Sequence, residues 1–171
     1  MDVWKVMVEH AAGWRTHRSK DGTWHRMTVT GSAHWAQAFD DTPAVPIFSR
    51  YFLGGRSLRG FEFREVGPRS NGRPTGGDFM LVLSTQYTIP LVSAESQGFG
   101  VDLNFFIDQG SLSADFDSFS GSDWRVAAGF GLGIAFGGPN QPPLLIDFGF
   151  PLRREAGDRK QLISVAFERT F

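Results

Sequence analysis

The stretch "WRVAAGFGLGIAF", residues 124–136, decides the fold class of this 171-residue chain. Every second residue is apolar and most of these are bulky, and the residues between are mostly glycine and alanine. Strict alternation predicts a β-strand, because successive side chains of a strand point to opposite faces. The small-residue face includes Gly129, Gly131 and Gly133. Such a face is unsuited to water, and it lets another part of the chain approach closely.

The same alternation recurs along the chain. Further segments with this pattern lie at 24–35, 79–89, 99–107, 144–150 and 161–171, with a weaker one at 3–13. They predict an all-β, antiparallel fold of about seven to eight strands. Several of these strands exceed the roughly five or six residues usual in soluble proteins, and they match the roughly 9 to 11 that a tilted strand needs to cross a membrane.

The connections between these strands differ in length. "RSKDG", "GGPNQPP" and "REAGDRK" predict tight turns, whereas residues 36–77 and 109–122 form much longer connections. Short turns at one end and long loops at the other are typical of outer-membrane barrels. Aromatic residues near the strand ends, such as Trp35 and Trp124, suit the two membrane interfaces.

Two architectures explain strands that have one apolar face. In a soluble sandwich or small barrel that binds an apolar ligand, the apolar face points inward. In an outer-membrane barrel the apolar face meets lipid and the other face lines the interior. The glycine- and alanine-rich second face favours the membrane barrel, and the soluble barrel stays as the alternative.

Composition argues against several other functions. The chain carries 17 basic and 18 acidic residues and no cysteine. This balance gives no support to nucleic-acid binding or to a polybasic membrane-surface protein. The four histidines show no metal-ligand spacing, and no nucleophile motif is present, so we expect no metal, no cofactor and no enzymatic activity. No run of apolar residues is long enough for a transmembrane helix, and the first residues do not resemble a signal peptide.

The long connection contains "LGGRSLRGFEFREVGPR", residues 53–69, which is rich in arginine and bracketed by glycines. With the residues before it, this segment resembles the sixth extracellular loop of the BamA superfamily, whose loop carries an Arg-Gly-Phe or Arg-Gly-Tyr motif. Here the motif is Arg59, Gly60 and Phe61, preceded by Gly54 and Gly55.

Other motifs extend the resemblance in the same order as in that family. "VDLNFFIDQGSL" is similar to the family strand that ends in Phe-x-Asp-x-Gly, which places Asp108 in the motif. "WRVAAGFGLGIAFGGPNQPPLLIDFGFPL" is similar to a Gly-x-Gly strand, a turn with proline and an Asp-x-Gly strand. The terminal "ISVAFERTF" resembles the C-terminal signal of outer-membrane barrels, with Phe167 and Phe171 as its aromatic residues.

The resemblance implies the C-terminal half of a 16-stranded barrel whose long loop folds into the lumen. In the family the loop arginine meets acidic groups on the inner wall, and the alternation independently places Asp108 on that wall. Gln86 stands where the family usually has glutamate, so we expect a looser lock or one that rests mainly on Asp108. We further expect Gly60 to give clearance, Phe61 to wedge against the glycine face, and Arg56 to matter little.

The function implied is assembly or insertion of outer-membrane proteins, or translocation across the outer membrane. The partners implied are outer-membrane lipid, unfolded outer-membrane or secreted proteins, and possible subunits of an assembly complex. A two-partner-secretion pore and the barrel of a patatin-type fusion are alternatives within the resemblance. The chain shows no POTRA repeats, so we expect a piece of a longer protein or a reduced member of the family.

Overall fold

The structure, a computed structural model, describes residues 2–20, 22–92, 98–136 and 142–167. Its main element is a seven-stranded antiparallel sheet with the linear order β1-β2-β6-β7-β8-β9-β11. The strands are β1 (Asp2–Arg18), β2 (Trp24–Phe39), β6 (Phe79–Val92), β7 (Phe99–Ser113), β8 (Arg125–Phe136), β9 (Leu144–Arg153) and β11 (Ile163–Phe167). The predicted all-β antiparallel fold is confirmed, with β1 and β11 as the two edges of an open sheet in the described part of the chain.

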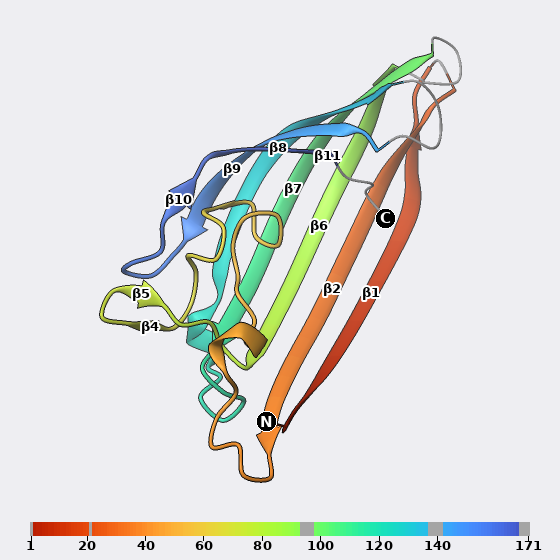
Figure 1. The fold of residues 1–171 in the computed structure, drawn as a ribbon. Helices are drawn as coiled ribbons and strands as arrows, with labels where there is room; N and C mark the ends of the chain where they lie inside the picture. Colours follow the sequence, from red (N-terminus) through yellow and green to blue (C-terminus); the bar gives the residue numbers. More distant parts are fainter. Residues whose placement is uncertain (1, 21, 93–97, 137–141, 168–171) are drawn as a thin grey trace.

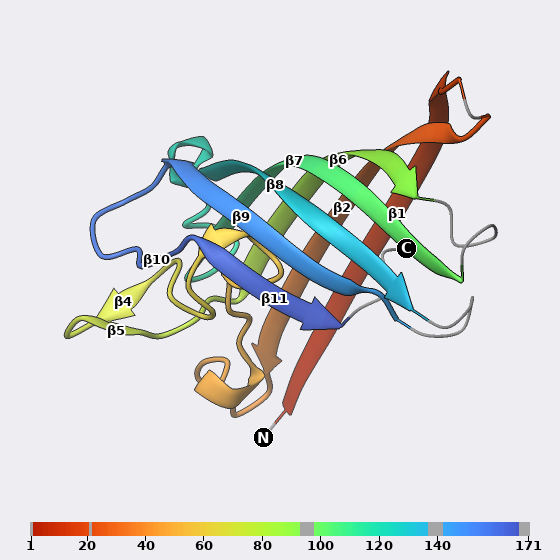
Figure 2. The same cartoon turned by 90° about the horizontal axis from the view of Figure 1, so that it is seen from above.

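Short elements lie in the connections. They are the single-turn helices η1 (Ile47–Ser49) and η2 (Gly121–Asp123) and the strands β3 (Gly60–Phe61), β4 (Arg69–Ser70), β5 (Arg73–Pro74) and β10 (Lys160–Gln161). Strand β3 pairs with β10, and β4 pairs with β5. The sheet is curved, and the long connection between β2 and β6 lies on its concave side (Figures 1 and 2). No helix in the described residues is both long and apolar enough to cross a membrane.

The two faces of the sheet differ as the alternation predicts. On β7, Phe105 and Ile107 are about half exposed on the convex face, whereas Asn104 and Asp108 on the other face are buried. Apolar side chains are exposed in the same way along β1, β8 and β11. This arrangement is the reverse of a soluble barrel, in which the apolar face forms the core.

Aromatic side chains gather on the sheet near the end where the long loops lie. Trp4 on β1 packs edge-on against Trp35 on β2, with ring centroids 4.7 Å apart. Trp35 in turn lies 5.4 Å from Phe116, and Phe79 contacts both Phe116 and Phe119. A continuous row of aromatic rings at this level is what a membrane interface favours.

One connection differs from its predicted position. Because the strands alternate in direction, the connections after β1, β6 and β8 leave from one end of the sheet, and those after β2, β7 and β9 leave from the other. The "REAGDRK" segment follows β9, so it lies at the end that carries the long loops and not with the other tight turns. Most of "GGPNQPP", residues 137–141, lies outside the described residues.

Candidate functional site

The loop segment before the Arg-Gly-Phe motif is a tight turn that only glycine permits. Gly54 and Gly55 have φ of 121° and 64°, values that side chains rarely adopt. The Gly55 amide donates to the Phe61 carbonyl at 2.9 Å, and the Leu58 amide donates to the Gly55 carbonyl at 3.3 Å. The two glycines therefore shape the loop itself, and the turn carries Arg56 and Arg59 toward the wall.

An apolar cluster holds this turn against the sheet. Leu53, Leu58, Phe61 and Val66 of the loop pack with Met80, Leu112 and Ala127 of strands β6, β7 and β8. Leu53, Leu58 and Phe61 are at most 1% exposed. Burial of such side chains supplies most of the loop's docking free energy, because each contributes roughly 1.5–3 kcal/mol relative to full exposure.

Arg59 is the centre of a buried polar cluster. Its Nε and Nη2 donate to the two carboxylate oxygens of Asp108 at 2.7 and 2.9 Å, and its backbone amide donates to Asp108 Oδ2 at 3.2 Å. Its Nη1 donates to Gln86 Oε1 at 2.9 Å. Ser84 donates to Asp108 Oδ1 at 2.6 Å. Arg59 is 8% exposed and Asp108 is 2% exposed, so this is a bidentate ion pair shielded from water.

A second ion pair adjoins the first and is absent from the sequence-based expectations. Arg56 Nη1 lies 2.7 Å from Asp147 Oδ2, and Asp147 is 2% exposed. Arg59 Nη1 also lies 3.7 Å from Asp147 Oδ1. This geometry argues against the expectation that Arg56 matters little, because its guanidinium pairs with a carboxylate buried in the wall.

An aromatic platform completes the site. The Arg59 guanidinium carbon lies 3.5 Å from the centroid of the Phe106 ring. Phe106 belongs to the inner face of β7 and is 3% exposed. A stacked guanidinium over a desolvated aromatic ring adds a cation–π attraction to the ion pair. The sequence showed Phe106 on the polar face, and this apolar outlier was the signal that could have found it.

The glycine face serves the wall's own side chains. A Cβ on Gly129 would overlap the Phe106 ring, and one on Gly131 would overlap the Asp147 carboxylate. A Cβ on Gly133 would sit 3.4 Å from the Leu145 side chain. Phe61 packs in the apolar cluster with Ala127, the first small residue of this face.

The close approach of loop and wall occurs at another pair of glycines. Gly60 has φ of 93°, and a Cβ there would lie 3.0 Å from the Gly149 carbonyl carbon and 3.3 Å from the Ala127 Cβ. A Cβ on Gly149 would lie 2.5 Å from the Gly60 nitrogen and 2.8 Å from the Arg59 carbonyl carbon. Backbone meets backbone here, which only glycine on both sides allows.

Gln86 is integrated into the polar wall. Besides accepting from Arg59, its amide nitrogen donates to Asn104 Oδ1 at 3.3 Å, and Thr88 Oγ1 donates to the same Asn104 oxygen at 2.7 Å. A neutral amide can bridge donors and acceptors in this way, whereas a carboxylate only accepts. Asp147, on β9, supplies the second negative charge that Gln86 lacks.

The remaining predicted positions are placed as follows. Phe167 ends β11 and is 70% exposed, and Phe171 lies outside the described residues. Among the described residues, no three histidine or acidic side chains are grouped to hold a metal ion. The cluster therefore consists of two guanidinium groups and two carboxylates, joining the loop to β6, β7 and β9.

Comparisons with known proteins identify the family of the chain. The family model of the Omp85 superfamily domain matches residues 2–171. The chain belongs to the Omp85 superfamily. Barrels of this superfamily are generally non-enzymatic transport or assembly proteins and typically lie in outer membranes. The resemblance stated from the sequence motifs is thus confirmed at the level of the family.

This Omp85 chain is also similar to a solved structure. The crystal structure of BamA from Haemophilus ducreyi lacking POTRA domains 1–3 matches with a TM-score of 0.75 and 19% sequence identity. The match covers 95% of this chain and 34% of that chain, so the present chain spans about a third of its length. At this identity the likeness shows the fold, which is that of part of the BamA barrel.

Proposed function

We propose that this Omp85 chain forms part of an outer-membrane barrel that assembles outer-membrane proteins or translocates proteins, with the Arg-Gly-Phe loop as an internal latch. The observation that carries the proposal is the buried cluster of Arg59 and Arg56 with Asp108 and Asp147. A loop that only covered the barrel from outside would not need charged side chains inserted into the wall.

The chemistry of the cluster suits a latch. Each arginine presents a planar, charged fork that suits the geometry of a carboxylate. The pairs stand on a polar wall of serine, threonine and amide side chains, which water can solvate when the loop leaves. The polar groups of the wall therefore keep hydrogen-bond partners when the loop is released, whereas release exposes the apolar cluster of the loop.

The outer face fits the lipid partner that this function requires. Large apolar side chains such as Val8, Trp14, Phe105 and Val165 are about half exposed on the described strands. In water such a surface favours aggregation, whereas in a bilayer it is the expected lipid-facing surface. Unfolded outer-membrane or secreted proteins and assembly-complex subunits are the protein partners within this proposal.

The test is the substitution Arg59→Ala in the full-length protein. We expect a strong loss of assembly or translocation, since Asp108 becomes a buried, unpaired carboxylate. The matched control is Arg73→Ala, which removes an exposed arginine of the same loop at strand β5. The readouts are insertion of an unfolded barrel protein into proteoliposomes and surface delivery of a secreted protein by cells.

The two readouts separate the two functions. A loss confined to barrel insertion assigns assembly, and a loss confined to surface delivery assigns translocation, as in a two-partner-secretion pore. Equal effects of Arg59→Ala and Arg73→Ala, or no effect of either on both readouts, would contradict the latch.

A further inference from the structure

The last strand of the sheet is joined to its neighbour over only part of its course. Strand β11 pairs with β9 from Phe167 opposite Leu144 to Ile163 opposite Phe148. Beyond that point the incoming chain leaves β9, with one more hydrogen bond of 2.9 Å from the Gly149 amide to the Leu162 carbonyl. All other neighbouring strands of the sheet pair over longer stretches.

The segment that precedes β11 pairs with the Arg-Gly-Phe motif instead. In the β10–β3 pair, Lys160 is opposite Phe61 and Gln161 is opposite Gly60. The Glu62 amide also donates to the Arg159 carbonyl at 3.0 Å. The motif is thus an extra antiparallel strand added to the chain that leads directly into β11, as the top view shows (Figure 2).

A further buried ion pair, between Arg125 and Asp158, holds this leading segment. Arg125 Nε donates to Asp158 Oδ2 at 3.0 Å, and Arg125 Nη2 donates to Glu155 Oε2 at 2.8 Å. Asp158 Oδ2 also accepts from the Glu155 amide at 2.8 Å, which closes the turn between β9 and β10. Arg125 and Asp158 are only 4% and 6% exposed.

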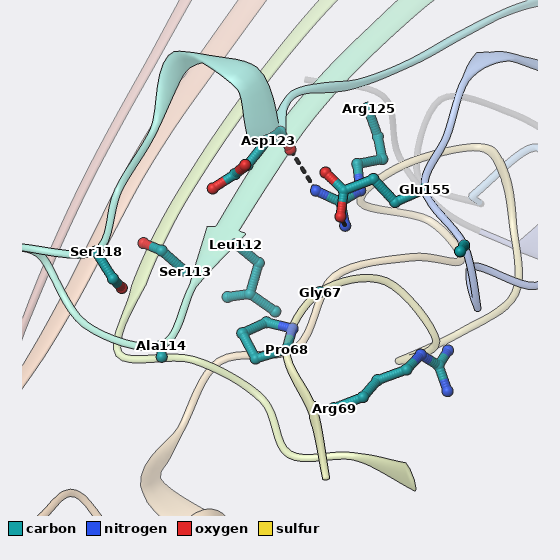
Figure 3. Close-up of a pocket in the computed structure, with 11 residues that line it drawn as sticks. Gly67, Pro68, Arg69, Leu112, Ser113, Ala114, Ser118, Asp123, Arg125 and Glu155 are labelled. Atoms are coloured by element: carbon teal, nitrogen blue, oxygen red, sulfur yellow. Dashed lines mark hydrogen bonds and ion pairs between the residues drawn. The ribbon is translucent and has the colours of Figure 1, made fainter. Parts of the chain in front are cut away.

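Arg125 lies between the Arg-Gly-Phe segment and the turn that joins β9 to β10. It lies on the inner face of β8, two residues before Ala127, against which Gly60 packs. On its other side it borders a cleft of about 350 Å³, whose walls include Arg69 of the loop and Glu155 of the last connection (Figure 3). Its guanidinium therefore holds the last connection in the place where that connection pairs with the motif.

We infer that Arg125 and Asp158 are positioning residues that hold the Arg-Gly-Phe segment and the last strand together as one unit. Docking of the loop on the wall and pairing of β11 with β9 then stabilise each other. Such coupling is reciprocal: loosening the last connection weakens the loop, and loosening the loop weakens the attachment of β11 by the same factor. This coupling goes beyond the proposed function and does not depend on it.

Amide hydrogen exchange on the full protein in lipid nanodiscs tests the coupling, because it requires no assembly activity. Arg125→Met removes the charge and the hydrogen-bond donors and keeps an unbranched apolar side chain. We expect exchange to quicken at the Glu62 amide of the loop and in residues 163–167. The expected change is about tenfold or more, as for loss of one charge-assisted hydrogen bond.

A substitution in the loop tests the coupling in the opposite direction, and a conservative substitution at Arg125 tests rescue. Arg59→Ala, in the loop, should quicken exchange at the Gly149 amide and in residues 163–167. Arg125→Lys keeps a charge for Asp158, and we expect it to restore much of the protection lost in Arg125→Met. If Arg125→Met does not fold, Asp158→Asn replaces it, since the amide keeps the shape of the carboxylate.

A matched control is Arg26→Ala, which removes an inner-wall arginine that pairs with Asp102 at 3.5 Å, away from the last connection. It should leave hydrogen exchange at the Glu62 amide and in residues 163–167 unchanged. Arg125→Met with faster exchange confined to residues 154–159, or Arg59→Ala with residues 163–167 unchanged, would overturn the coupling. Those results would leave the assembly or translocation proposal untouched.

Discussion

Arg59 reaches three strands from a single side chain. It contacts Gln86 and Ser84 on β6, Asp108 on β7 and Asp147 on β9. A guanidinium is the side chain suited to this, because its five donors lie in one plane and point in different directions. Lysine at this position would keep the charge and lose the bidentate geometry.

Arg56 is the residue where the structure changes the expectation most. We predict that Arg56→Ala destabilises the protein by about 1–3 kcal/mol, because Asp147 loses its closest cation. The effect is smaller than that of Arg59→Ala, since the Arg56 side chain is 35% exposed and water replaces part of the interaction. Heat unfolding in detergent measures the difference.

The partner variant serves as its control. Arg56→Ala combined with Asp147→Asn removes both charges, and we expect it to recover part of the lost stability. An unchanged unfolding midpoint in Arg56→Ala alone would show that Asp147 does not need this arginine.

Gly149 gives a purely steric prediction. We expect Gly149→Ala to displace the Arg-Gly-Phe segment, because its Cβ would overlap backbone atoms of Arg59 and Gly60 that have no room to move. The loss of protein function should approach that of Arg59→Ala. Gly121→Ala is the matched control, since a Cβ there meets nothing within 4 Å. Protease accessibility of the loop reports the displacement, and a loop equally protected in both variants would contradict the prediction.

The charge balance of the cluster predicts the effect of Gln86→Glu on stability. The cluster already balances two arginines with two aspartates, so Gln86→Glu adds an uncompensated, partly buried carboxylate and removes the donor to Asn104. We predict that this substitution fails to strengthen the latch, measured as no rise in the unfolding midpoint. A clear rise would mean that the cluster lacks negative charge.

Sequence reasoning found part of this residue-scale chemistry. Alternation was enough to place Asp108 on the inner wall, and the family motif pointed to Arg59. Asp147 shares that inner face by the same alternation, but its distance from Arg56 depends on how the loop turns at Gly54 and Gly55. A turn built on left-handed backbone leaves no periodic pattern, so the second ion pair was missed.

At the scale of elements, backbone pairing with the sheet fixes the long connection at Asp78, just before β6. The Asp78 amide donates to the Ser113 and Ala114 carbonyls, and the Asp78 carbonyl accepts from the Ala36 amide. The Asp78 side chain lies 3.5 Å from Arg50. Burial raises the pKa of the Asp78 carboxyl above its ordinary value of 3.8, with Arg50 opposing and Asp115 reinforcing the rise.

This raised pKa predicts a pH dependence of stability. Between the ordinary pKa and the raised one, the folded protein holds a proton that the unfolded chain has released. Stability from this group is therefore present below pH 3.8 and lost as the pH rises through the folded pKa. We expect Asp78→Asn to match the wild type in acid and to be the more stable protein at neutral pH.

Unfolding midpoints of the two proteins between acid and neutral pH measure this difference. Comparison with the variant removes the contribution of all other titrating groups. A difference that stays constant with pH, or one that favours the wild type at neutral pH, would contradict the assignment.

Element boundaries were less predictable than element type. The weak pattern at 3–13 becomes the 17-residue strand β1, because nearly its whole length pairs with β2. Strand β2 likewise runs on to Phe39, into the segment expected to be loop. In both cases pairing with the neighbouring strand extends the strand past the residues whose alternation predicted it.

At the scale of the whole molecule, the fold is one curved sheet with apolar residues outside and the loop docked within. The number and type of its main strands, its two faces and its family were all predictable from alternation and motif order. The pairing of the Arg-Gly-Phe segment with β10 was not, because a two-residue strand has no period to detect. That pairing is what joins the loop to the edge strand β11.

The central claim is that Arg59 and Asp108 act as one latch between the loop and the wall. A double-mutant cycle on assembly or translocation by the full-length protein, with Arg59→Ala, Asp108→Ala and both together, tests it most directly. We predict that the double variant is no more impaired than the worse single variant, because either change opens the same latch. Losses that simply add would show that the two residues act independently, and would contradict the latch.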